Sequence, residues 1–152
     1  MRLALYQPDI PQNLGAAIRL AACFGAPLEV IEPCGFPLTD KSLRRAALDY
    51  GDLARVERCA SLVDFLGRPA RREGRLVLVE TDGAASLYDF AFATGDTLML
   101  GRESAGSPPE LYAAAATSVR IPMASNMRSL NVVVAAAIVL AEALRQTGGL
   151  ET

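Results

Sequence analysis

The polar residues that could do chemistry are grouped in three turns of this 152-residue chain. The first turn runs from Pro11 to Arg19 and contains Asn13, which suits the N-cap of a following helix. Gly15 and Arg19 are four residues apart, so they share one face of that helix. A glycine inside a helix costs roughly 1 kcal/mol relative to alanine, so Gly15 indicates a close approach to that face. The alternative is a tolerated glycine beside an exposed arginine.

The second turn follows the short apolar run Leu98–Leu100 and contains Gly101 and Gly106. Glycines at this spacing suggest a phosphate-binding loop, but Ser-Pro follows Gly106 where such a loop requires Lys-Ser or Lys-Thr. What remains is a glycine-flanked turn that presents Glu103 and backbone amides.

The third turn, from Arg120 to Asn131, is rich in proline and polar residues and precedes the last helical pattern. Arg128, Ser129 and Asn131 fall where side-chain oxygens or backbone amides at a helix N-terminus could hold a polar ligand. The alternative is that Ser129 only caps the helix.

Composition restricts the chemistry these turns can perform. The chain contains no histidine, which excludes a histidine general base, a Ser-His-Asp nucleophile and every zinc site that uses histidine. The three cysteines are scattered and form no C-x-x-C pair, so we expect reduced thiols and a cytoplasmic location. The longest apolar run, Val132–Ala141, is ten residues, and a membrane span needs about twenty, so no membrane role is expected.

The net charge is −2, yet fourteen of the fifteen cations are arginine. Arginine presents a planar fork suited to phosphate and carboxylate. An acidic total argues against nonspecific coating of nucleic acid but leaves room for a defined phosphate-bearing partner. The alternative is that these are ordinary surface residues. The basic residues form two clusters: Lys41, Arg44 and Arg45, then Arg68, Arg71, Arg72 and Arg75.

Short apolar runs alternate with helical patterns along the whole chain, which predicts one α/β domain over 1–152 with a mostly parallel sheet and helices on both faces. The expected strands are Leu3–Tyr6, Leu28–Ile31, Leu76–Val79, Leu98–Leu100, Val119–Ile121 and, more weakly, Ala54–Cys59. The expected helices are Leu14–Phe24, Lys41–Leu48, Ser61–Leu66, Pro109–Ala116 and about Ser129–Gln146, with Arg68–Gly74 as a connection. The last helix is apolar nearly all round and must be covered on most sides, by a subunit interface or by burial within a monomer.

The three turns, in this order and spacing, resemble the signature motifs of the SPOUT superfamily of RNA methyltransferases: N-x-G-x-x-x-R, L-G-x-E-x-x-G, and I-P-M followed by S-L-N. The stretches Glu32–Phe36 and Lys41–Tyr50 are similar to one subgroup, the single-domain tRNA wobble-nucleotide (cytidine/uridine) 2′-O-methyltransferases. The resemblance covers nearly the whole chain.

The resemblance implies an S-adenosylmethionine-dependent enzyme, forming S-adenosylhomocysteine and needing no metal. It implies a deep C-terminal trefoil knot, with the knot and cofactor pocket formed by about residues 76–146, an obligate homodimer, and the tRNA anticodon stem-loop as partner. Carried over by position, Arg19 would be the catalytic arginine, with Asn13 and Glu103 supporting the site. The residues expected at the cofactor are Val79, Gly101, Ile121, Met123, Ser129 and Leu130, and those expected at RNA phosphates are Lys41, Arg44 and Arg45.

The chain departs from the family pattern where RNA is expected to lie. Asp82 stands where relatives often carry lysine, Ala105 where a basic residue is common, and Arg102 where proline is usual. Two other functions remain open: 2′-O-methylation of another RNA site, such as ribosomal RNA, and a noncatalytic RNA-binding module.

Overall fold

The computed structural model describes residues 1–39, 41 and 55–150. Within these residues the strands form a parallel sheet in the order β3-β2-β1-β6-β4-β7-β5. The strands are β1 (Arg2–Tyr6), β2 (Leu28–Ile31), β3 (Val56–Cys59), β4 (Leu76–Val79), β5 (Ala85–Ser86), β6 (Thr97–Leu100) and β7 (Thr117–Arg120). The helices are α1 (Pro11–Cys23), α3 (Leu62–Gly67), α4 (Ala70–Glu73), α5 (Pro109–Ala114), α6 (Val132–Thr147) and the short 3-10 helix η2 (Leu87–Asp89).

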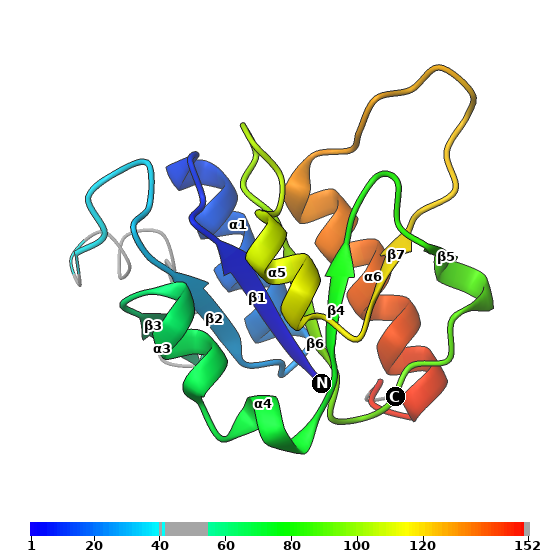
Figure 1. Cartoon of the computed structure of the whole chain (residues 1–152), viewed down its shortest axis with the longest axis horizontal. Helices are drawn as coiled ribbons and strands as arrows, with labels where there is room; N and C mark the ends of the chain where they lie inside the picture. The colour runs from blue at the N-terminus through cyan, green and yellow to red at the C-terminus, as the bar shows by residue number, and fades with distance from the viewer. Residues whose placement is uncertain (40, 42–54, 151–152) are drawn as a thin grey trace.

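Helices cover both faces of the sheet, as the alternating pattern predicts. Helices α1 and α6 pack on one face, where Ile18 and Leu140 are buried against Leu3 and its neighbours (Figure 1). Helices α3 and α5 pack on the other face through Phe65 and Leu111. Successive strand residues point to opposite faces, so each short apolar strand contributes to both cores.

The predicted strands agree with the structure except at two places. The strand predicted at Val119–Ile121 is β7, which begins at Thr117 and ends at Arg120. The two-residue strand β5 and the single turn α4 were not predicted because elements this short show no periodicity. Helix α4 lies inside Arg68–Gly74, which the sequence indicated only as a connection. The helix predicted at Lys41–Leu48 lies, apart from Lys41, outside the described residues.

The prediction that Asn13 caps the first helix is wrong. The N-cap of α1 is Ile10, and Pro11 occupies the first helical position, where its missing N–H is not needed. Asn13 therefore lies within the first turn of the helix, and its side chain bonds to other turns of the chain.

The second arginine cluster is used mainly to hold the fold together. Arg71 Nη2 lies 2.6 Å from Oε2 of Glu29, and both side chains are buried. The Arg71 guanidinium also stacks 4.2 Å from the centre of the Phe65 ring. Arg68 pairs with Glu57 at 2.9 Å, and Arg75 pairs with Asp96 at 2.7 Å. Three of the four clustered arginines are thus bound by carboxylates of the chain itself.

Replacing Glu29 with glutamine should destabilise the protein by about 1–3 kcal/mol, because Arg71 would keep its buried charge and lose its ionised partner. The free energy of unfolding measured in urea checks this. The control is Glu142→Gln, which breaks the more exposed Glu142–Arg145 pair on α6 and should shift the urea midpoint far less. Equal shifts for the two variants would contradict a special role for the buried pair.

Candidate functional site

A cavity of about 360 Å³ lies at the carboxyl edge of the sheet, where β4, β6 and β7 end and where α1 and α6 begin. Parallel strands bring the turns that follow them to one edge, which is where open α/β sheets bind ligands. The lining comprises Ile10, Asn13, Val79, Glu80, Thr81, Leu100, Gly101, Arg102, Glu103, Gly106, Ile121, Met123, Ser129, Leu130, Asn131, Val132 and Ala135. All three motif turns therefore contribute to one cavity.

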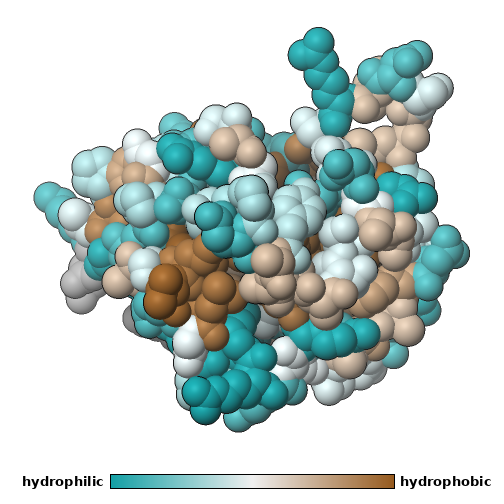
Figure 2. Space-filling model, viewed as in Figure 1, coloured by the Kyte–Doolittle hydropathy of each residue, from teal (hydrophilic) through white to brown (hydrophobic). Residues whose placement is uncertain are grey.

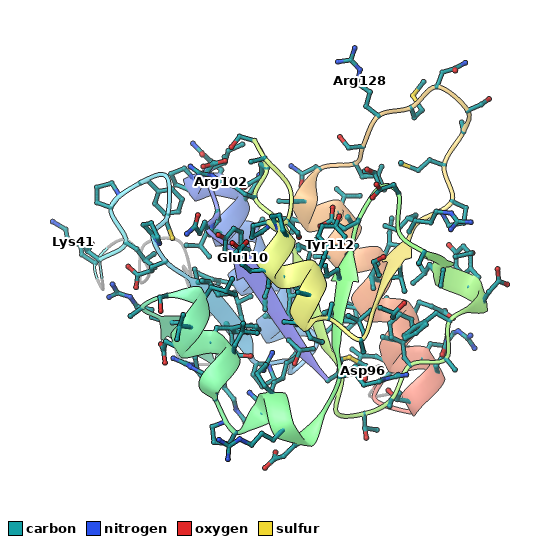
Figure 3. The ribbon with its side chains drawn as sticks, viewed as in Figure 1. Lys41, Asp96, Arg102, Glu110, Tyr112 and Arg128 are labelled. Atoms are coloured by element: carbon teal, nitrogen blue, oxygen red, sulfur yellow. The ribbon has the colours of Figure 1, made fainter. Side chains whose placement is uncertain are left out.

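The structure brings most of the predicted site residues together. All six residues expected at the cofactor line the cavity, and so do Asn13 and Glu103. Arg19 is exposed on α1 and lies outside the lining. Lys41 is exposed and lies on the opposite side of the molecule from Arg128 of the third turn (Figure 3). Arg44 and Arg45 lie outside the described residues.

Asn13 joins the three turns by hydrogen bonds. Its Nδ2 donates to Oε1 of Glu103 at 3.0 Å, and its Oδ1 accepts from Nδ2 of Asn131 at 3.1 Å. The backbone N–H of Asp9 donates to the other Glu103 oxygen at 2.8 Å. Both oxygens of Glu103 are therefore engaged inside the protein. These two bonds tie the Asn13 side chain and the turn after β1 to Glu103.

Asp9, which none of the three motifs contains, holds the second turn through its side chain. Its carboxylate accepts hydrogen bonds from Nε of Arg102 at 2.7 Å and from the Ser104 hydroxyl at 2.5 Å. These bonds, Arg102 first, lower the pKa of Asp9 to about 2. The positive charge that Arg102 adds to the second motif is thus paired with an acid of the same chain. The only signal in the sequence was that Asp9 closely follows a strand.

Gly101 is required by the tight shape of the second turn. The backbone N–H of Arg102 donates to the Gly106 carbonyl at 3.0 Å, and the N–H of Gly106 donates back to the Arg102 carbonyl at 2.7 Å. A Cβ on Gly101 would lie 2.6 Å from the carbonyl carbon of Gly106 and 2.7 Å from the backbone nitrogen of Ser107. Only a residue without a side chain lets these backbone segments approach so closely.

The third turn leads into α6 through Asn131, whose Oδ1 accepts hydrogen bonds from the N–H groups of Val133 and Val134. Asn131, rather than Ser129, is therefore the N-cap of this helix. The loop 122–130 before it stands away from the body of the protein (Figures 1 and 2). Met127 is 63% exposed on this loop, and Arg128 points away from the sheet (Figure 3).

The lining combines apolar and polar side chains, as ligand cavities commonly do. Val79, Leu100, Ile121, Val132 and Ala135 supply apolar surface, while Glu80, Thr81, Ser129 and Asn131 supply polar groups beside it. Among the described residues, no cluster of acidic and cysteine side chains could hold a metal ion. Within the same residues, no helix has the length and apolarity needed to cross a membrane.

Comparisons with known proteins show to which family this chain belongs. A protein of Beijerinckia indica named tRNA (cytidine(34)-2′-O)-methyltransferase is 50% identical over 148 residues, covering 97% of this chain and 92% of that protein. A protein of Escherichia coli K12 with the same name is 40% identical over 150 residues, covering 97% and 94%.

Solved structures of RNA methyltransferases are also similar to this chain. One described by "Structural insights into the 2-OH methylation of C/U34 on tRNA" superposes with a TM-score of 0.88 at 42% identity, covering 98% of this chain and 97% of that one. The SpoU methyltransferase AviRb of Streptomyces viridochromogenes, in complex with AdoMet, gives a TM-score of 0.83 at 30% identity, covering 96% and 60%. The sequence model of the SpoU rRNA Methylase family matches residues 1–141, and this chain belongs to that family.

Proposed function

We propose that this protein transfers a methyl group from S-adenosylmethionine to the ribose 2′-OH of the wobble nucleotide in a tRNA anticodon loop. The observation that carries the proposal is the convergence of the three motif turns on one cavity, with Asn13 hydrogen-bonded to Glu103 and Asn131. The names of relatives that match nearly end to end support the wobble nucleotide as the target. The structure titled for methylation of C/U34 supports it as well.

The lining fits S-adenosylmethionine. The apolar wall around Val79 and Ile121 would hold the adenine, and Gly101 keeps the second turn tight beside that wall. Bound S-adenosylmethionine would supply an electrophilic methyl group: the ribose 2′-oxygen would take it as the methyl–sulfur bond breaks, leaving S-adenosylhomocysteine, and the hydroxyl proton would pass to water. The protein must hold the hydroxyl in line with that methyl group. No metal and no covalent nucleophile are needed for this step.

We assign two tasks to Arg19. It orients the ribose 2′-hydroxyl, and it stabilises the negative charge that develops on the 2′-oxygen. Arginine is a poor base because its pKa exceeds about 12, so an electrostatic role suits it better than proton removal. Asn13 and Glu103 support the site by positioning its turns, because Glu103 accepts a hydrogen bond from the Asn13 side chain at the cavity.

The proposal includes a homodimer. One side of α6 is buried against the sheet through Ala136 and Leu140, but Val134 on this helix remains 48% exposed. Ile10 and Leu130, which also line the cavity, are exposed apolar residues as well. A second copy that covers these side chains would remove apolar surface from water next to the site. We place the enzyme in the cytoplasm, where tRNA is modified.

The proposal also includes the trefoil knot, formed by about residues 76–146 of the single domain 1–152. Fifteen of the seventeen lining residues fall between Val79 and Ala135, which supports a pocket built by that segment. For RNA binding we propose Lys41, Arg44 and Arg45 as contacts to backbone phosphates, which supply affinity but no base specificity.

Incubation with labelled S-adenosylmethionine and RNA from a strain that lacks the enzyme tests the function. We expect label in tRNA, and mass spectrometry should place the new methyl group on the ribose of the wobble nucleotide. Label only in ribosomal RNA would move the target to the substrate for which the family is described. Label in neither RNA would favour a noncatalytic RNA-binding module.

A further inference from the structure

Glu80 is a second carboxylate in the cavity, and no motif accounts for it. It directly follows β4 and lines the cavity beside Val79 and Thr81. Its backbone N–H donates to the Val119 carbonyl at 3.0 Å, which anchors it to β7. Its side chain reaches toward the second turn, where a Cβ placed on Gly106 would lie 3.9 Å from Oε2.

The two cavity carboxylates differ in what they bind. Both oxygens of Glu103 accept hydrogen bonds within the protein. Glu80 Oε1 is fully buried and, like the hydroxyl oxygen of nearby Ser107, has no hydrogen-bond partner among the residues that the structure describes. Burial is the main reason that the pKa of Glu80 is raised, and Asp82 raises it further, whereas nearby Ser107 partly offsets these effects.

A buried carboxylate oxygen without a donor is costly, because its lost hydration is not replaced. Donors supplied by a ligand would remove that cost. Resting on the function proposed above, we propose that Glu80 accepts hydrogen bonds from the vicinal ribose hydroxyls of the bound cofactor.

Position favours the ribose over the other donors of the cofactor. Val79 belongs to the apolar wall that suits the adenine, and Glu80 is the next residue along the chain. In the cofactor, the ribose is joined directly to the adenine. A carboxylate offers two acceptor oxygens and no donor, which matches two adjacent hydroxyl donors. In this role, Glu80 makes the site select a cofactor that carries both ribose hydroxyls.

Calorimetric binding of S-adenosylhomocysteine and of its 2′-deoxy and 3′-deoxy analogues tests this role without measuring activity. Wild-type protein should bind the intact product roughly 10-fold more tightly than either analogue, because each analogue leaves part of the carboxylate unpaired. Glu80→Gln should weaken binding of the intact product by roughly the same factor and leave the two analogues little changed, so the preference should disappear.

The matched control is Glu110→Gln, which removes the same charge from an exposed position on α5 and should keep the preference (Figure 3). Equal binding of the product and both analogues by the wild type would overturn the proposal without any variant. Equal weakening of all three ligands by Glu80→Gln would also overturn it, because Glu80 would then contact the ammonium group instead. Failure of the wild type to bind the product would overturn the proposed function itself.

Discussion

Gly101→Ala should weaken binding of S-adenosylhomocysteine by at least about 100-fold while the sheet remains folded. The added Cβ would lie 2.6 Å from the carbonyl carbon of Gly106 and 2.7 Å from the backbone nitrogen of Ser107. These are backbone atoms, so no side chain can rotate away to make room. The turn must shift as a whole, and it carries Arg102, Glu103 and Gly106, which all line the cavity.

Calorimetry would measure the binding, and circular dichroism would confirm that the variant is folded. Gly67→Ala is the matched control, because nothing lies within 4 Å of a Cβ at that position at the end of α3. We expect the control to bind the product as the wild type does. Tight binding by Gly101→Ala would mean that the second turn does not contact the cofactor.

The fold was predicted best where strands are buried on both faces. The short, mainly apolar runs at Leu28–Ile31 and Leu76–Val79 match β2 and β4 to the residue, because strands between two helix layers need mostly apolar side chains. Glu29 in β2 is the exception, and it is buried as the partner of Arg71. The start of α1 was misplaced because Asn13 suggested a cap, although Pro11 was the better indicator of the first helical turn. Strand β5 depends on its pairing with β7, which no local pattern reveals.

The cavity lining was predicted where a motif exists, and residues whose place comes only from tertiary contacts were missed. Residues as far apart as Asn13 and Ser129 line one cavity, and only the motif resemblance linked them in advance. Asp9 was missed because its importance comes from pairing with Arg102, 93 residues away. Glu80 was missed for a different reason, because none of the three motifs contains it, although its neighbour Val79 was predicted at the cofactor.

Arg19→Ala should lower the rate of methyl transfer to tRNA by about 100- to 1,000-fold, the effect typical of removing one group that stabilises charge in a transition state. Arg19 is exposed and lies outside the cavity lining. The loss should therefore appear in kcat, and the Kd for S-adenosylhomocysteine should stay unchanged. Single-turnover methylation with labelled cofactor and calorimetry on the same protein would separate the two quantities.

Arg19→Lys separates charge from geometry at the same position. Lysine keeps the positive charge but lacks the planar fork that can hold a hydroxyl and a neighbouring phosphate together, so it should restore little of the lost activity. Arg145→Ala, on an exposed part of α6, is the control for loss of a surface arginine and should methylate normally. Near-full activity of Arg19→Lys would show that charge alone suffices. Loss of product binding in Arg19→Ala would instead place Arg19 in the cofactor site.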